Sequence, residues 1–72
     1  MQPLNFAVIG AGNIGKIQAA ALQQIPDARI TVVCNRGETA GRALADQVGA
    51  VWVADFADAV TRPDVDVVTI CT

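Results

Sequence analysis

The 72-residue chain is rich in apolar residues: 53% are hydrophobic, 17% are charged, and the formal net charge is −2. This composition is typical of a packed globular chain and excludes an intrinsically disordered one. The five basic residues are scattered, which excludes the basic cluster of a nucleic-acid-binding surface. No apolar run approaches the roughly 20 residues of a membrane-spanning helix, and no secretory leader is visible. We therefore expect a soluble, cytoplasmic protein with neither a nucleic-acid partner nor a membrane partner.

The sequence contains two cysteines and no histidine. Cys34 and Cys71 each lie in an apolar run and share no metal-like spacing, so we expect both to be buried core thiols. The lack of histidine excludes a histidine-based metal site or catalytic triad within this stretch. We therefore expect no metal site in this stretch.

The first elements follow from apolar patterning. Residues 4–9 (LNFAVI) predict a buried strand, because they form a short apolar run that ends at a glycine. Residues 13–25 predict a helix, which Pro26 ends. Its apolar face is expected to comprise residues spaced by three or four: Ile14, Ile17, Ala21 and Ile25.

The middle of the chain repeats this alternation. Residues 29–35 predict a second buried strand, and residues 38–48 predict a second helix with Gly49 as its C-terminal cap. The stripe of this helix that faces the sheet is expected to consist of Ala40, Ala43, Leu44 and Val48.

The last third adds a short strand at residues 50–54, a short helix at residues 55–60 that Asp55 caps, and a fourth strand at residues 65–72. Apolar strands that alternate with amphipathic helices predict an α/β fold, in which helices cover both faces of a doubly wound parallel sheet. In a Rossmann dinucleotide-binding half the strand order is 3-2-1-4. The fourth strand is then an open, apolar edge that invites pairing. We therefore expect the chain to be part of a larger domain and to associate when isolated.

The first predicted strand runs directly into the sequence GAGNIG, which comprises Gly10, Ala11, Gly12, Asn13, Ile14 and Gly15. This is the glycine fingerprint of dinucleotide-binding folds at the strand-to-helix junction that it requires. The first glycine allows a sharp turn, the second lets a pyrophosphate approach the backbone, and the third lets the helix pack closely. The N–H groups at the start of the helix would then face the phosphate oxygens. In the alternative interpretation these are only tight-turn glycines of an α/β fold.

At the end of the second predicted strand, the fingerprint expects an acidic residue that binds the ribose hydroxyls of NAD. The sequence instead has Asn35, followed by Arg36 and Gly37, and Glu38 comes three residues after Asn35. A missing carboxylate removes the repulsion of the 2′-phosphate of NADP, and an arginine can bind that phosphate. We therefore expect NADP to be preferred over NAD. In the alternative, Asn35 bonds the ribose well enough to accept either cofactor.

Ligands of doubly wound sheets bind beyond the carboxyl ends of the strands. Ile70, Cys71 and Thr72 end the fourth predicted strand, so they are candidates for lining the cofactor site. Trp52, the only tryptophan of this chain, is expected to pack in the core or at the sheet edge, with stacking on a ligand as the alternative.

With these motifs in view, the sequence resembles the Gfo/Idh/MocA oxidoreductase family along essentially its whole length. The stretches that carry the resemblance are FAVIGAGNIGKIQAAAL, GRALADQVGA, DFADAV and PDVDVVTICT. The resemblance implies that residues 1–72 are the N-terminal part of an NAD(P)-binding Rossmann domain. The rest of that domain and an α+β domain with the substrate pocket and an oligomer interface would follow. It implies a homo-oligomeric NAD(P)-dependent oxidoreductase acting on a hydroxyl or carbonyl of sugars, inositols or related compounds.

By position, the resemblance places the cofactor pyrophosphate at residues 10–15, its adenosine end at Asn35 and Arg36, and its nicotinamide end near Cys71 and Thr72. The family's catalytic residues, including the lysine of a Glu-Lys-Pro motif, follow the fourth strand. No catalytic residue is therefore assigned here, and residues 1–72 alone are expected to bind cofactor weakly and to be inactive. The alternative is a non-catalytic nucleotide-sensing regulatory module, because the fold alone does not settle function. The sequence after Thr72 would separate the two.

Overall fold

The computed structural model describes residues 3–71, in which strands and helices alternate along the chain. The elements are β1 (Leu4–Ile9), α1 (Asn13–Gln23), β2 (Ala28–Cys34), α2 (Glu38–Val48), β3 (Val51–Val53), α3 (Phe56–Val60) and β4 (Val67–Ile70). The predicted alternation of strands and helices is confirmed, and the predicted bounds of β1 and α2 are those of the structure.

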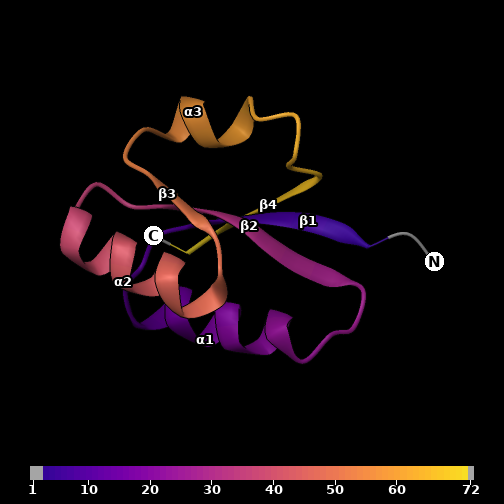
Figure 1. Cartoon of the computed structure of the whole chain (residues 1–72). Coiled ribbons are helices and arrows are strands. Elements are labelled where there is room, and N and C mark those ends of the chain that lie inside the picture. The colour runs from indigo at the N-terminus through magenta and orange to yellow at the C-terminus, as the bar shows by residue number, and fades with distance from the viewer. Residues whose placement is uncertain (1–2, 72) are drawn as a thin grey trace.

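All strand pairs in the sheet are parallel, and the strand order is β3-β2-β1-β4. This is the predicted order, so the doubly wound α/β fold is confirmed. β1 pairs with β2 along its whole length, and its residues from Phe6 to Ile9 also pair with β4. The carboxyl ends of all four strands therefore meet at one edge of the sheet (Figure 1).

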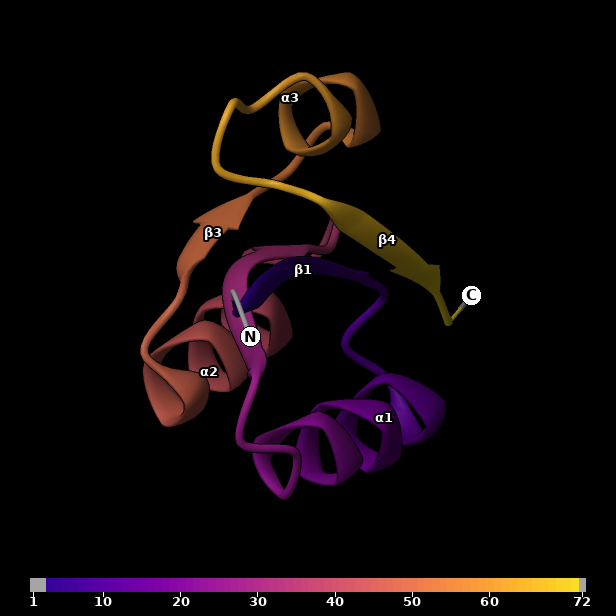
Figure 2. The same cartoon turned by 90° about the vertical axis from the view of Figure 1, so that its right-hand side faces the viewer.

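Successive residues of the central strands point to opposite faces of the sheet, and each face is buried. Val8 and Val33 pack with residues of α1 and α2, whereas Ala7 and Val32 pack with Ala59 of α3. Figure 2 shows α1 and α2 together on one side of the sheet and α3 alone on the other. Because both faces are covered, the inner parts of β1 and β2, residues 6–9 and 32–34, are continuous apolar runs rather than alternating ones.

The expected apolar face of α1 was wrong. Ile14 and Ile17 are 61% and 66% exposed, Ile25 lies beyond the end of the helix and is 51% exposed, and Ala21 is exposed too. The face that meets the sheet consists instead of Gly15, Ala19 and Leu22. Two of these residues are small, so the helix axis approaches the strands closely. Their low hydrophobicity makes this face hard to find from apolar spacing.

The expected face of α2 was partly wrong for the same reason. Leu44 is buried and Val48 packs against the same core, as predicted, but Ala40 and Ala43 are exposed. The other buried positions of α2 are Gly41 and Ala45. The predicted cap is confirmed: Gly49 ends the helix in the left-handed conformation with φ 75°, which disfavours residues with a Cβ.

The outer strands are shorter than predicted. β4 begins at Val67 rather than at residue 65, because Asp66 belongs to the preceding turn, where its carboxylate accepts a hydrogen bond from the Asn5 amide. Asp55 caps α3 as predicted, since its side chain accepts from the Ala57 amide. None of the helices within residues 3–71 has the length and apolar character needed to cross a membrane.

Candidate functional site

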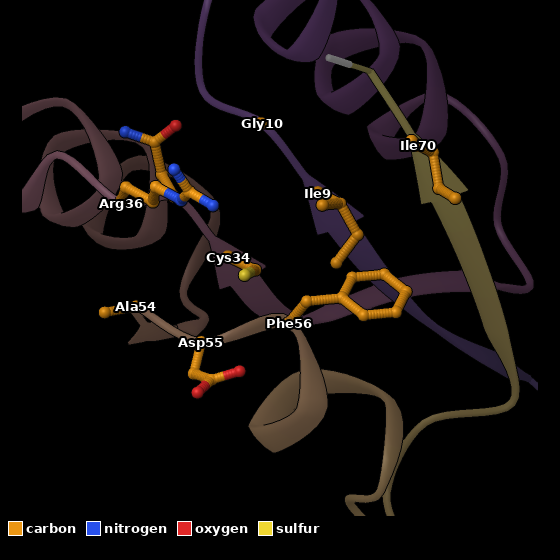
Figure 3. A pocket seen from close by; sticks show the side chains of 9 residues that line it. Ile9, Gly10, Cys34, Arg36, Ala54, Asp55, Phe56 and Ile70 are labelled. Carbon is orange, nitrogen blue, oxygen red and sulfur yellow. The ribbon is translucent and has the colours of Figure 1, made fainter.

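A cleft of about 860 Å³ opens at the edge of the sheet where the four strands end. Its walls are residues that follow or complete different strands (Figure 3): Ile9, Gly10, Cys34, Asn35, Arg36, Ala54, Asp55, Phe56 and Ile70. Ligands of open α/β sheets bind at this edge, and the cleft is large enough for part of a dinucleotide. The cleft is therefore the candidate cofactor site.

The glycine turn forms one side of this edge, between β1 and α1. Gly10 has φ 105°, a conformation that residues with a Cβ rarely adopt, and its amide donates to the Cys34 carbonyl at 2.7 Å. A Cβ on Gly15 would lie 1.9 Å from the Gly10 carbonyl oxygen, so α1 packs directly on the turn. A Cβ on Gly12 would meet nothing within 4 Å among the described residues. The turn is thus closed toward the protein at Gly15 and open toward solvent at Gly12.

The first turn of α1 follows the glycine turn directly, and the first N–H groups of a helix have no partner within the helix. Gly12 occupies the N-cap position without a side-chain hydrogen bond, and Asn13 and Ile14 are exposed. Helix N-termini of this kind bind anions through free N–H groups and the helix dipole. Ala11, by contrast, is 2% exposed and packs in the core. Of the predicted site residues 10–15, only Gly10 is among the residues that line the cleft, whereas Gly12, Asn13 and Ile14 are exposed beside it.

Asn35 follows β2 and lines the cleft, as predicted. Its side-chain oxygen accepts a hydrogen bond from the Ala11 amide at 3.1 Å, and its side-chain nitrogen donates to the Gly37 carbonyl at 2.9 Å. The structure thus brings the end of β2 into direct contact with the glycine turn. The sequence predicted that these segments share a site, but not that Asn35 links them.

Arg36 lines the same cleft and is exposed. Among residues 3–71, the ion pairs join Arg42 to Glu38 and Arg62 to Asp64, so Arg36 has no carboxylate partner there. Glu38 lies closest in sequence but pairs with Arg42 one turn along α2, at 2.5 Å. The guanidinium of Arg36 is consequently free to meet an anion in the cleft.

The end of β4 contributes differently from the prediction. Ile70 lines the cleft and is 65% exposed, but Cys71 is half-buried, packs against the core shared with α1, and is not among the residues that line the cleft. Its backbone amide continues the pairing with β1 by donating to the Ile9 carbonyl at 2.8 Å. Thr72 lies outside the described residues.

Sequence reasoning missed the contribution of the segment after β3, namely Ala54, Asp55 and Phe56. The sequence predicts Asp55 only as a helix cap, although β3 ends at the same edge as β2. The signal was therefore topological, since a strand order of 3-2-1-4 places the end of β3 beside the end of β2. Cys34 was also missed as a lining residue, and it forms an apolar part of the cleft wall. Burial raises the pKa of its thiol, and the Asp55 and Asp58 carboxylates add a smaller effect in the same direction.

Trp52 packs against protein rather than lining the cleft, which confirms the packing interpretation. Its indole covers Gly41 of α2 so closely that a Cβ there would lie 2.3 Å from the indole Cδ1. The Arg42 guanidinium lies 4.9 Å from the centre of the ring, and the indole Nε1 donates to the Asn35 carbonyl at 2.8 Å. Trp52 thus holds the residue that follows β2 through a hydrogen bond, without lining the cleft itself.

A parallel sheet of this order, with a glycine turn after β1 and a cleft at the carboxyl ends of the strands, defines a Rossmann-type dinucleotide-binding fold. The family described as "Oxidoreductase family, NAD-binding Rossmann fold" matches residues 4–72. The chain belongs to this family, the Gfo/Idh/MocA oxidoreductases.

Individual relatives agree with this assignment. The chain is 37% identical over 70 residues to inositol 2-dehydrogenase of Rhizobium meliloti (strain 1021), covering 96% of this chain and 21% of that protein. It is similar to the crystal structure of GenD2 from gentamicin A biosynthesis in complex with NAD, with a TM-score of 0.95 and 29% identity over 100% of this chain and 21% of that one. It also matches a myo-inositol dehydrogenase from Corynebacterium glutamicum ATCC 13032, with a TM-score of 0.91 and 31% identity over 97% of this chain and 21% of that one. The chain thus spans about one fifth of the length of these proteins.

Proposed function

We propose that this chain binds the dinucleotide cofactor of an NAD(P)-dependent oxidoreductase that acts on a hydroxyl or carbonyl of a sugar, an inositol or a related compound. The observation that carries the proposal is the cleft at the carboxyl edge of the sheet, bounded by Gly10 at the start of the glycine turn and by the ends of β2, β3 and β4. Membership of the family, the inositol dehydrogenase relatives and the NAD complex of GenD2 support it. A cytoplasmic location stays a prediction.

The residues of the chain would bind and orient the cofactor rather than perform chemistry. The pyrophosphate would lie on the N–H groups at the start of α1 beside Gly12, where a side chain is absent and the backbone is open. The adenosine end would lie at Asn35 and Arg36. A bound nicotinamide supplies the hydride acceptor or donor. We place the proton-transferring groups and the substrate pocket outside residues 1–72, so this stretch alone should be inactive.

We further propose that NADP is preferred over NAD. The carboxylate that lines the cleft is that of Asp55, after β3, and the end of β2 has none. Glu38 pairs with Arg42, and Arg36 carries a positive charge without a carboxylate partner among the described residues. A 2′-phosphate would therefore meet an arginine and no acidic residue at the end of β2.

The test is to titrate the complete polypeptide with NADPH and NADH and to repeat the titrations with Arg36→Ala. A hydrogen bond to a charged group is worth about 1.5–3 kcal/mol, so NADPH should bind the variant about tenfold to hundredfold more weakly, with a smaller change for NADH. Arg29→Ala, which removes an exposed arginine at the opposite end of β2, is the matched control and should change neither affinity.

The outcomes separate the parts of the proposal. Tighter binding of NADH than of NADPH would contradict the NADP preference and leave dinucleotide binding intact. Binding of neither cofactor would contradict the proposed function. Saturable binding without any cofactor-dependent turnover of inositols or sugars would favour the nucleotide-sensing alternative.

A further inference from the structure

Asn35 lies where three segments meet at the carboxyl edge of the sheet: the glycine turn, the loop between β2 and α2, and β3. Its backbone amide donates to the Val53 carbonyl at 3.1 Å, and its backbone carbonyl accepts from the Trp52 indole at 2.8 Å, so both groups bind β3. Its side chain binds the glycine turn through Ala11 and the loop between β2 and α2 through Gly37. Backbone and side chain of Asn35 together therefore hold the turn, the loop and β3 in one arrangement.

The two side-chain contacts are met by an amide but not by an ionised carboxylate of the same size. The Ala11 amide is a donor and requires an acceptor, whereas the Gly37 carbonyl is an acceptor and requires a donor. An asparagine side chain offers one of each, and an ionised aspartate offers acceptors only. The space is also restricted, because the Asn35 side-chain nitrogen lies 3.3 Å from where a Cβ on Gly37 would be.

We propose that Asn35 is a positioning residue for cofactor binding, which acts through the glycine turn and the Arg36–Gly37 loop, and is not the group that accepts the ribose hydroxyls. This inference rests on the proposed dinucleotide function. It assigns the side chain of Asn35 to protein backbone at both of its ends. Contacts with the adenosine end of the cofactor then fall to Arg36 and to the loop that Asn35 fixes.

The expected effect of Asn35→Asp on NAD binding is opposite to the one that the glycine fingerprint predicts. An acidic residue at the end of β2 ordinarily binds the ribose of NAD, so Asn35→Asp would be expected to create NAD binding. In this structure the same change sets a carboxylate oxygen against the Gly37 carbonyl oxygen. Repulsion between the two acceptors displaces the loop that carries Arg36, which weakens binding of both cofactors.

The test uses Asn35→Asp in the complete polypeptide, with affinities for NADH and NADPH and the melting temperature measured from about pH 8 down to about pH 4.5, above the ordinary aspartate pKa of about 3.9. The Gly37 carbonyl should raise the carboxyl pKa in the folded state. The neutral carboxyl, which can donate to Gly37, is favoured at low pH and lost as pH rises through that pKa. We expect both cofactors to bind about tenfold more weakly at neutral pH, with the deficit against wild type shrinking as pH falls.

Two controls accompany this variant. Gln47→Glu adds the same charge at an exposed position of α2 and should show no pH-dependent deficit. Asn35→Ala removes both side-chain hydrogen bonds and should bind weakly at every pH, because it has no group to protonate. A deficit of equal size and pH dependence in Gln47→Glu would overturn the proposal, since net charge alone would then explain the effect.

A second variant covers the case in which Asn35→Asp does not fold. Trp52→Phe keeps an aromatic ring on Gly41 but removes the donor to the Asn35 carbonyl. Although Trp52 does not line the cleft, its loss should weaken both cofactors by about twofold to tenfold, the value of one ordinary hydrogen bond. Unchanged affinity in this variant would argue against positioning through Asn35.

The decisive contrary result is tighter NADH binding by Asn35→Asp at neutral pH that is lost as pH falls, which is the behaviour of a ribose-binding carboxylate. Failure of the wild type to bind either dinucleotide would overturn the proposed function instead. In that case the melting temperatures, measured without cofactor, still test whether the Asn35 side chain holds the turn and the loop together. A melting temperature of Asn35→Asp that approaches that of wild type as pH falls supports this role, and one that does not approach it contradicts this role.

Discussion

At the scale of single residues, the glycines of the β1–α1 turn carry different constraints. Gly12 has extended backbone angles that other residues adopt, with φ −78° and ψ −166°, and a Cβ there would meet nothing among the described residues. Gly15 is confined by the backbone of Gly10, which cannot move aside as the tip of a side chain can. The space beside Gly12 therefore serves a ligand in the proposed function, whereas the space beside Gly15 serves the fold.

Substitution of each glycine by alanine should separate these roles. Gly12→Ala should change the free energy of unfolding by less than about 1 kcal/mol, yet weaken dinucleotide binding, because its methyl group occupies the path of the pyrophosphate. Gly15→Ala should lower the free energy of unfolding by about 1–3 kcal/mol or more through overpacking. Denaturant unfolding and cofactor titration of both variants measure the two effects. Normal cofactor affinity in Gly12→Ala would contradict the proposed pyrophosphate position.

The residue types of the site were predictable where a motif names them. The glycine fingerprint and its spacing predicted Gly10, Asn35 and Arg36, which line the cleft. The cofactor-binding role of residues 10–15 stays a prediction. The hydrogen bonds that join Asn35 to Ala11 and Trp52 were not found, since these residues are 24 and 17 positions away and only the folded sheet brings them together. Asp55 and Phe56 were missed because no motif covers the segment after β3.

At the scale of elements, the order and type of every strand and helix followed from the sequence, but the buried faces of α1 and α2 did not. The hydrophobic pattern predicted that Ile14 and Ile17 are buried, but they are exposed. It did not predict Gly15 or Gly41, which are buried. Close packing of helix on sheet selects for small residues, and small residues contribute little to an apolar pattern. This is why strand and helix existence is easier to predict than helix orientation.

Truncations on the two faces of α1 test its orientation. Leu22→Ala, on the face that meets the sheet, should lower the free energy of unfolding by about 2–3 kcal/mol, because it removes buried methyl groups and leaves a cavity. Ile17→Ala, on the exposed face, should cost about 0.5 kcal/mol or less. The measurement is urea unfolding of both variants beside wild type. A larger loss for Ile17→Ala than for Leu22→Ala would favour the face that the apolar spacing predicted.

At the scale of the whole molecule, the core is well covered on the α1–α2 side but thin on the other. A single short helix, α3, covers the second face, and Phe56, Val60 and Ile70 are 48%, 38% and 65% exposed. Within the described residues β4 pairs only with β1, so its outer edge has unpaired backbone groups. Exposed apolar side chains beside an open strand edge favour association with other chains.

Residues 1–72 expressed alone should therefore self-associate as concentration rises, with the β4 edge at the contact. Light scattering over a concentration series measures this, and Ile70→Lys should reduce it, because a charged side chain at an edge strand opposes pairing. Lys16→Arg, a neutral change on exposed α1, is the control. A single monomeric species at high concentration would contradict the expectation.

The position of Trp52 also has an optical consequence. This chain has a single tryptophan, and its indole lies one hydrogen bond away from a residue that lines the cofactor cleft. Indole emission responds to the hydrogen bonding of its ring nitrogen, and a reduced nicotinamide cofactor absorbs in the range in which indole emits. In residues 1–72 the fluorescence of one native side chain therefore reports on the cleft without any added label.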